Sequence, residues 1–127
     1  MAVDQPILIE HAKVKEFEIM GLRHQTLAGE KQGLKTLEIW RISMPPGSES
    51  PVNQHYGEVV VMTLKGTGRA QVDQESLDLF PNTSLILPPN VTRQFFNTGE
   101  EDLELLAIRS LARPPEKTIM EVLGSRP

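Results

Sequence analysis

The residues with the clearest chemistry lie in two stretches, "PVNQHYGEVVVMTLKGTG" at residues 51–68 and "PNTSLILPPNVTRQFFN" at residues 81–97. The first contains His55, and an imidazole can bind a metal ion or transfer a proton near neutral pH. The second contains Arg93, whose planar guanidinium can hold a carboxylate with two hydrogen bonds. The chain has no cysteine, which excludes disulfides, thiolate metal sites and a cysteine nucleophile. Histidine and arginine are therefore the first candidates for its chemistry.

The length and composition are those of one globular domain. The 127 residues are 39% hydrophobic and 24% charged, with a formal net charge of −4. No stretch is basic enough to follow a phosphate backbone, so nucleic acid is not expected as a partner. The N-terminus lacks the pattern of a signal peptide, and no apolar run is long enough to cross a bilayer. We therefore expect a cytoplasmic protein that makes no membrane contact.

The elements that must position His55 and Arg93 are predicted to be strands. Residues 37–44 alternate along the chain, and residues 58–64 are apolar on both faces, as in a strand covered on both sides. Short strands separated by turn residues follow to residue 110, which favours an all-β sandwich or barrel. Helix signals are limited to a short C-terminal segment at 118–124, while residues 1–35 fit strand or helix equally well.

The spacing of the two stretches resembles the motifs of the cupin superfamily. The first cupin motif, G-x5-H-x-H-x3-E-x6-G, corresponds here to Gly47, Asn53, His55, Val59 and Gly66. The second, G-x5-P-x-G-x2-H-x3-N, corresponds to Asn82, Pro88, Asn90, Arg93 and Asn97. The resemblance implies a single jelly-roll β-barrel (a double-stranded β-helix), with the barrel at about 37–110, N-terminal strands or an arm at 1–36 and a tail at 111–127. Asparagine at the two glycine positions is compatible with the turns, because it enters the left-handed region readily.

The positions that hold a metal in typical cupins are the ones that differ most. Of the four metal-binding positions of the motifs, only His55 is kept. Asn53 stands in place of the first histidine, Val59 in place of the glutamate, and Arg93 in place of the last histidine. Valine offers no donor, and the fixed charge of an arginine repels a cation. Glu58 is expected to point to the face opposite Val59. No metal cofactor is therefore predicted; the alternative is a dioxygenase-like cupin that holds iron, manganese, nickel or zinc through His55 and non-standard ligands.

The same substitutions predict a small-molecule site inside the barrel. Its expected ligand-binding residues are Asn53, His55, Val59, Val61, Thr63, Arg93 and Phe95. Such an apolar cup with a few convergent polar groups is the usual form of a ligand pocket. We expect an anionic, carboxylate-like metabolite held by Arg93 and Asn53.

Whether the protein is an enzyme stays open from the sequence. Some metal-free cupins are sugar epimerases with a histidine base, so the resemblance allows His55 to act in isomerase or lyase catalysis. No acidic partner for His55 is evident, however, and a non-catalytic binding or regulatory cupin is the other alternative.

Several residues also have structural interpretations. His55 could bond across the barrel, Arg93 could pair with an internal glutamate, and Asn53 could be a turn residue. Trp40 is expected in the core or at a dimer contact, and His24 on the surface.

One row of apolar side chains is expected to face outward. If Val59 and Val61 point into the barrel, then Val60, Met62 and Leu64 point out. An outward apolar row needs a cover, either the N-terminal segment or a second subunit. We expect a symmetric homodimer.

Overall fold

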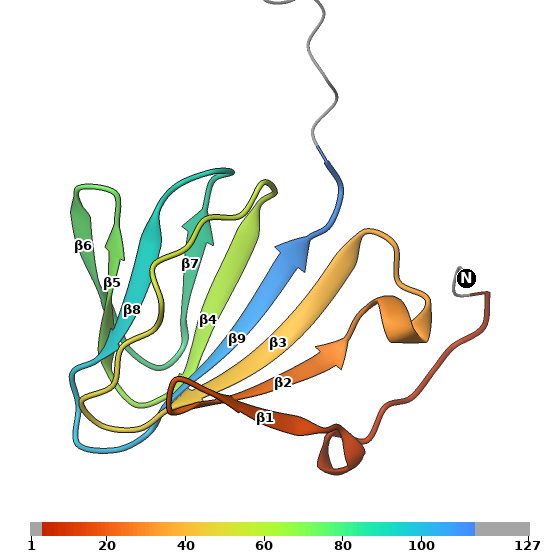
Figure 1. Cartoon of the computed structure of the whole chain (residues 1–127), viewed down its shortest axis with the longest axis horizontal. Helices are drawn as coiled ribbons and strands as arrows, with labels where there is room; N and C mark the ends of the chain where they lie inside the picture. Colours follow the sequence, from red (N-terminus) through yellow and green to blue (C-terminus); the bar gives the residue numbers. More distant parts are fainter. Residues whose placement is uncertain (1–3, 114–127) are drawn as a thin grey trace, which may run out of the picture.

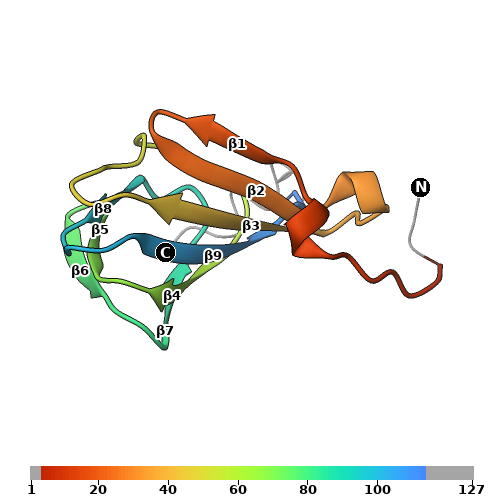
Figure 2. The same cartoon turned by 90° about the horizontal axis from the view of Figure 1, so that it is seen from below.

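The computed structural model describes residues 4–113 as two β-sheets that face each other (Figure 1). The larger sheet has the strand order β1-β2-β3-β9-β4-β7, which can be followed in Figure 2, and the smaller has the order β6-β5-β8. The strands are β1 (Glu16–Ile19), β2 (Leu22–Ala28), β3 (Leu37–Met44), β4 (Val59–Lys65), β5 (Gly68–Val72), β6 (Glu75–Leu79), β7 (Thr83–Leu87), β8 (Arg93–Asn97) and β9 (Leu103–Ser110). Two short 3-10 turns, η1 (His11–Lys13) and η2 (Glu30–Gln32), complete the described elements. The all-β prediction is confirmed.

The centre of the larger sheet is built from β9, which pairs antiparallel with β3 on one side and with β4 on the other. Leu103, Leu105 and Ala107 of β9 are buried, and the two residues between them are only half-buried. In β4, Val59, Val61 and Thr63 are buried in the same alternating way. These strands therefore place one set of side chains between the sheets and the other set on the outer face.

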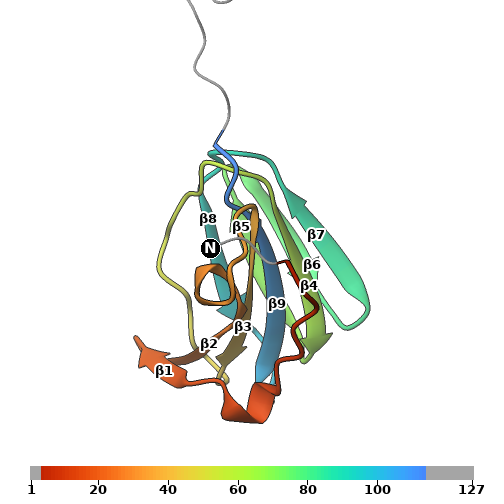
Figure 3. The same ribbon diagram turned by 90° about the vertical axis from the view of Figure 1, so that its right-hand side faces the viewer.

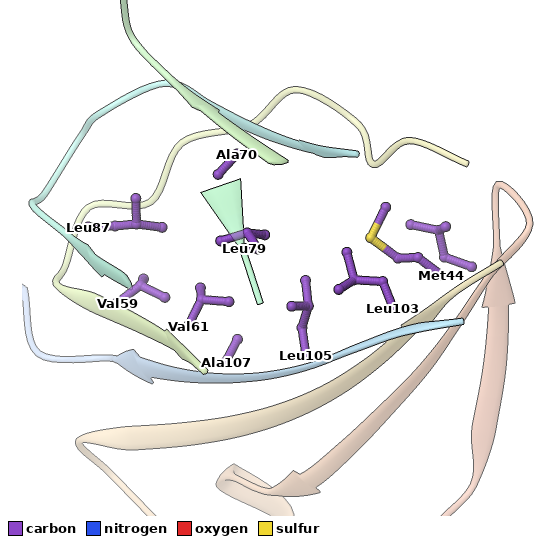
Figure 4. Packing of buried hydrophobic residues seen from close by; sticks show 10 residues of the cluster. Met44, Val59, Val61, Ala70, Leu79, Leu87, Leu103, Leu105 and Ala107 are labelled. Carbon is purple, nitrogen blue, oxygen red and sulfur yellow. The ribbon is translucent and has the colours of Figure 1, made fainter. Parts of the chain in front are cut away.

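The core is tightly packed at one end of the sandwich. Met44, Leu103 and Leu105 are almost completely buried there, as Figure 4 shows. A Cβ atom added to Gly68 would lie 2.4 Å from the Phe96 carbonyl oxygen and 2.6 Å from the Leu103 side chain. The first contact is with the neighbouring strand β8 of the same sheet and the second with β9 of the facing sheet, so a side chain at position 68 would meet both.

The turns explain how the altered cupin motif still folds. Asn82 and Asn90 both have φ of 66°. Both asparagines therefore occupy the left-handed region, as the sequence predicts for residues at glycine positions.

The N-terminal part of the chain joins the larger sheet. Strands β1 and β2 form a hairpin, and β2 pairs antiparallel with β3. The side view in Figure 3 shows this hairpin at the edge of the larger sheet. The predicted helix at 118–124 lies outside the described residues. Within residues 4–113, no helix is long and apolar enough to cross a membrane.

Candidate functional site

A cavity of about 220 Å³ opens between the sheets. Its walls are mostly apolar, and residues of β2, β3, β4, β8 and β9 contribute to it. Among the residues that the sequence predicts for ligand binding, the cavity is lined by Asn53, Val59, Val61, Arg93 and Phe95. His55 and Thr63 are buried but are not among the lining residues.

Arg93 is the central charged residue of this cavity. Its backbone exchanges two hydrogen bonds with Asn53: Arg93 N donates to the Asn53 carbonyl oxygen at 3.0 Å, and Asn53 N donates to the Arg93 carbonyl oxygen at 3.1 Å. This pair fixes the start of β8. The residue is only 6% exposed, and its Nη1 atom is buried with no hydrogen-bond partner among residues 4–113. No carboxylate of the described chain forms an ion pair with it. Burial, and secondly the Arg109 guanidinium, lowers the pKa of Arg93.

The imidazole of His55 is held by two hydrogen bonds. Its Nε2 atom lies 2.6 Å from the Ser110 carbonyl oxygen, and its Nδ1 atom lies 2.8 Å from Arg109 Nη2. A carbonyl only accepts and a guanidinium only donates, so Nε2 carries the proton and Nδ1 accepts. Burial lowers the pKa of His55, the Ser110 carbonyl opposes this shift, and Arg109 adds to it. The neutral His55 is therefore fixed in place outside the cavity lining, with both nitrogens already engaged.

Arg109 is the functional residue that the sequence reasoning missed. Its guanidinium lies 3.8 Å from the centroid of the Trp40 ring, and its Nη1 donates to Glu38. Its Nη2 donates to His55, while Nε is buried with no partner among the described residues. The alternation of Leu105, Ala107 and Arg109 along one strand was the signal that could have placed it inside.

Two further residues line the cavity, and one of them, His24, lies elsewhere than expected. His24 was predicted on the surface, but it is half-buried, lines the cavity and contacts the Trp40 ring edge-on at 4.6 Å between centroids. The cause is its place on β2, where it pairs with Ile42 on the inner face of the sheet. Burial lowers the pKa of His24. Trp40, expected in the core or at a dimer contact, packs against the hydrophobic core and also lines the cavity, where its ring stacks on Arg109.

The donors at the cupin metal positions do not fit a metal ion. Val59 has no donor, Arg93 is a buried cation, and both nitrogens of His55 are already bonded. Glu58 is exposed, on the opposite side from the cavity-lining Val59. Within residues 4–113, no three histidine, aspartate or glutamate side chains come together as a metal site would require.

The geometry can now be compared with known proteins. A family model described as auxin binding protein matches residues 4–123. The chain belongs to the auxin-binding protein family. Auxin-binding protein T85 of Nicotiana tabacum is 36% identical over 112 residues, which cover 79% of this chain and 59% of that protein. Auxin-binding protein 1 of Arabidopsis thaliana is 37% identical over 107 residues, covering 76% and 53%. This member thus spans a little over half the length of these curated relatives.

Solved structures show the fold of this auxin-binding family member. A predicted oxalate decarboxylase from Thermotoga maritima superposes with a TM-score of 0.74 at 21% identity, covering 84% of this chain and all of that one. An RmlC-like cupin from Shewanella frigidimarina gives a TM-score of 0.73 at 22% identity, covering 86% and 94%. The cupin jelly roll that the motif spacing predicts is therefore confirmed.

Proposed function

We propose that this protein binds a small monocarboxylate with an apolar or aromatic body in the cavity between its sheets, without a metal ion. The observation that carries the proposal is Arg93: a buried guanidinium, with one unpartnered donor, in a mostly apolar cavity. A carboxylate satisfies such a group, because it supplies both the charge and the acceptor that the guanidinium lacks.

The charges around the cavity favour a ligand with one negative charge. Arg93 and Arg109 contribute two positive charges, and Glu38, which pairs with Arg109, contributes one negative charge. Burial lowers the pKa of both His24 and His55, which favours their neutral forms. One positive charge is left without a partner, and a single carboxylate balances it.

The body of the ligand is expected to be apolar because most of the wall is. Trp40, Phe95 and Leu105 line the cavity beside the arginines. The two relatives are named for binding auxin, and indole-3-acetate, an aromatic ring with one carboxylate, is a suitable probe for the ligand class that this cavity suggests. We therefore propose binding or sensing as the function, with His55 as a positioning residue for Arg109.

A thermal-shift panel tests this proposal. A ligand at about 100 times its dissociation constant stabilises a protein by about 2.7 kcal/mol, or a rise of roughly 10 °C in Tm for a domain of this size. Aromatic monocarboxylates such as indole-3-acetate should produce such shifts, whereas dicarboxylates and amines should not. The Arg93→Gln variant should lose the shift, and Arg41→Gln, which removes an arginine from the outer face, should keep it. If indole-3-acetate and phenylacetate failed to stabilise the wild-type protein, the proposed ligand class would be wrong.

We also propose a homodimer formed by the outer face of the larger sheet. An apolar row crosses four strands there through Ile39, Ile108, Val60 and Ile86, and Ile86 is 69% exposed. Light scattering should give a dimer for the wild-type protein and a monomer for Ile86→Lys; a monomeric wild type at tens of micromolar would contradict this.

A further inference from the structure

Two arginines on different sheets lie at the same end of the sandwich. At the packed end, Gly68 of β5 is in contact with Leu103 of β9, and Gly68 pairs with Asn97 of β8. Arg93 begins β8, four residues before Asn97, and Arg109 lies six residues after Leu103 on β9. With a rise of about 3.3 Å per residue, both lie roughly 13–20 Å from the packed end. Both also line the cavity, so they face it from opposite sheets.

Each of these arginines has one fully buried nitrogen without a hydrogen-bond partner among residues 4–113. These atoms are Nη1 of Arg93 and Nε of Arg109, both fully buried. Buried donors are rarely left unpaired, because each lost hydrogen bond is unfavourable. The other nitrogens of Arg109 are bonded to Glu38 and His55, and its flat face lies on Trp40. Arg109 is thus held in one orientation, and Nε is its one buried nitrogen without a partner among residues 4–113.

We infer that one ligand carboxylate bridges Arg93 and Arg109, with one oxygen on Arg93 Nη1 and the other on Arg109 Nε. This inference rests on the proposed function and deepens it, because it makes Arg109 a binding residue and the carboxylate the link between the two sheets. Sheets packed face to face are about 10 Å apart, a gap that two inward arginine side chains with a carboxylate between them can span. Glu38, Trp40 and His55 are then positioning residues that set the direction of Arg109 Nε.

A first test needs no ligand. A carboxylate built into the protein by Arg93→Glu should accept from Arg109, whereas Arg93→Gln offers no charge. The quantity measured is the Tm of Arg93→Glu minus the Tm of Arg93→Gln. We expect this difference to be more positive when Arg109 is present than in an Arg109→Gln background. The expected change in this difference is about 4 °C or more, as for a charge pair in contact. Equal differences in the two backgrounds would overturn the bridge, because two arginines that share one carboxylate lie close enough for a charge at one position to interact with the other.

A second test uses indole-3-acetate and calorimetry on the full chain. Arg93→Gln and Arg109→Gln should each raise the dissociation constant about tenfold or more. In the double variant the factor should be smaller than the product of the two single factors, because both groups bind one carboxylate. Since Arg109→Gln leaves Glu38 unpaired, the pair should also be removed together as Glu38→Gln/Arg109→Gln. The matched control is Arg41→Gln/Glu104→Gln, which removes the other ion pair between β3 and β9 on the outer face.

The outcomes separate the two proposals. Full-strength binding by Glu38→Gln/Arg109→Gln, with loss in Arg93→Gln, would overturn the bridge and leave the proposed function standing. Indole-3-acetate binding that is unchanged in both Arg93→Gln and Arg109→Gln would overturn both. If the losses of affinity in Arg93→Gln and Arg109→Gln multiplied in the double variant, the two arginines would act independently, which would also contradict a shared carboxylate.

Discussion

Replacing Arg93 by methionine should make the protein more stable while it loses its ligand. Arg93 is 6% exposed, has a buried Nη1 without a partner among residues 4–113, and forms no ion pair there. An unpaired buried donor costs about 1–3 kcal/mol, and replacing buried ionic groups by apolar side chains of similar volume often stabilises proteins by about 1–4 kcal/mol. Methionine keeps a long flexible stem in the same space. Its backbone can still pair with Asn53.

We expect the free energy of unfolding of Arg93→Met to rise by about 1–3 kcal/mol, or roughly 4–12 °C in Tm for a domain of this size. Urea unfolding followed by Trp40 fluorescence measures the first quantity and calorimetry the second. Arg41→Met is the control, because it breaks a partly exposed ion pair that is worth about 0–1 kcal/mol. A loss of about 1 kcal/mol or more in Arg93→Met would refute the reasoning, since it would mean that the guanidinium is already well satisfied in the free protein.

Three other predictions concern the fold and its histidines. Burial lowers the pKa of His24 and His55, so the unfolded chain binds more protons than the folded chain below the ordinary histidine pKa of 6.5. The free energy of unfolding should therefore be full above pH 6.5 and fall as the pH drops below it. A flat profile of this free energy between pH 7.5 and 5.5 would contradict the prediction. Asn90→Ala should destabilise by about 1–2 kcal/mol in urea unfolding because φ is 66° there, whereas Asn90→Gly should not. Gly68→Ala should lower stability by about 1–3 kcal/mol, because the added Cβ would meet the Phe96 carbonyl oxygen of the neighbouring strand and the Leu103 side chain of the facing sheet. An unchanged Tm would show that both neighbours can move to make room for the added Cβ.

The fold could be predicted because its determinants are local in sequence. Strand alternation and the intervals from Gly47 to Gly66 and from Asn82 to Asn97 specify where strands and turns occur. The asparagines show that this depends on backbone geometry, since Asn82 and Asn90, at the two glycine positions of the motif, both adopt the left-handed conformation that favours glycine.

The site was harder to predict because it depends on register between distant strands. Glu38 and Arg109 meet only because β3 and β9 pair, 71 residues apart in the chain. His55 precedes the regular part of β4, so strand alternation does not govern its side chain, which bonds to Ser110 instead of lining the cavity. His24 lies on a strand that the sequence could not distinguish from a helix, which left its direction open.

The measurement that tests the central claim most directly is calorimetric titration with indole-3-acetate and with indole-3-acetamide, its neutral counterpart, in the presence of EDTA. The account predicts that the acid binds, that the amide binds at least tenfold more weakly, and that Arg93→Gln removes this preference, because the buried arginine holds the carboxylate. Equal binding of acid and amide, or binding of the acid only after a divalent metal is added, would contradict it.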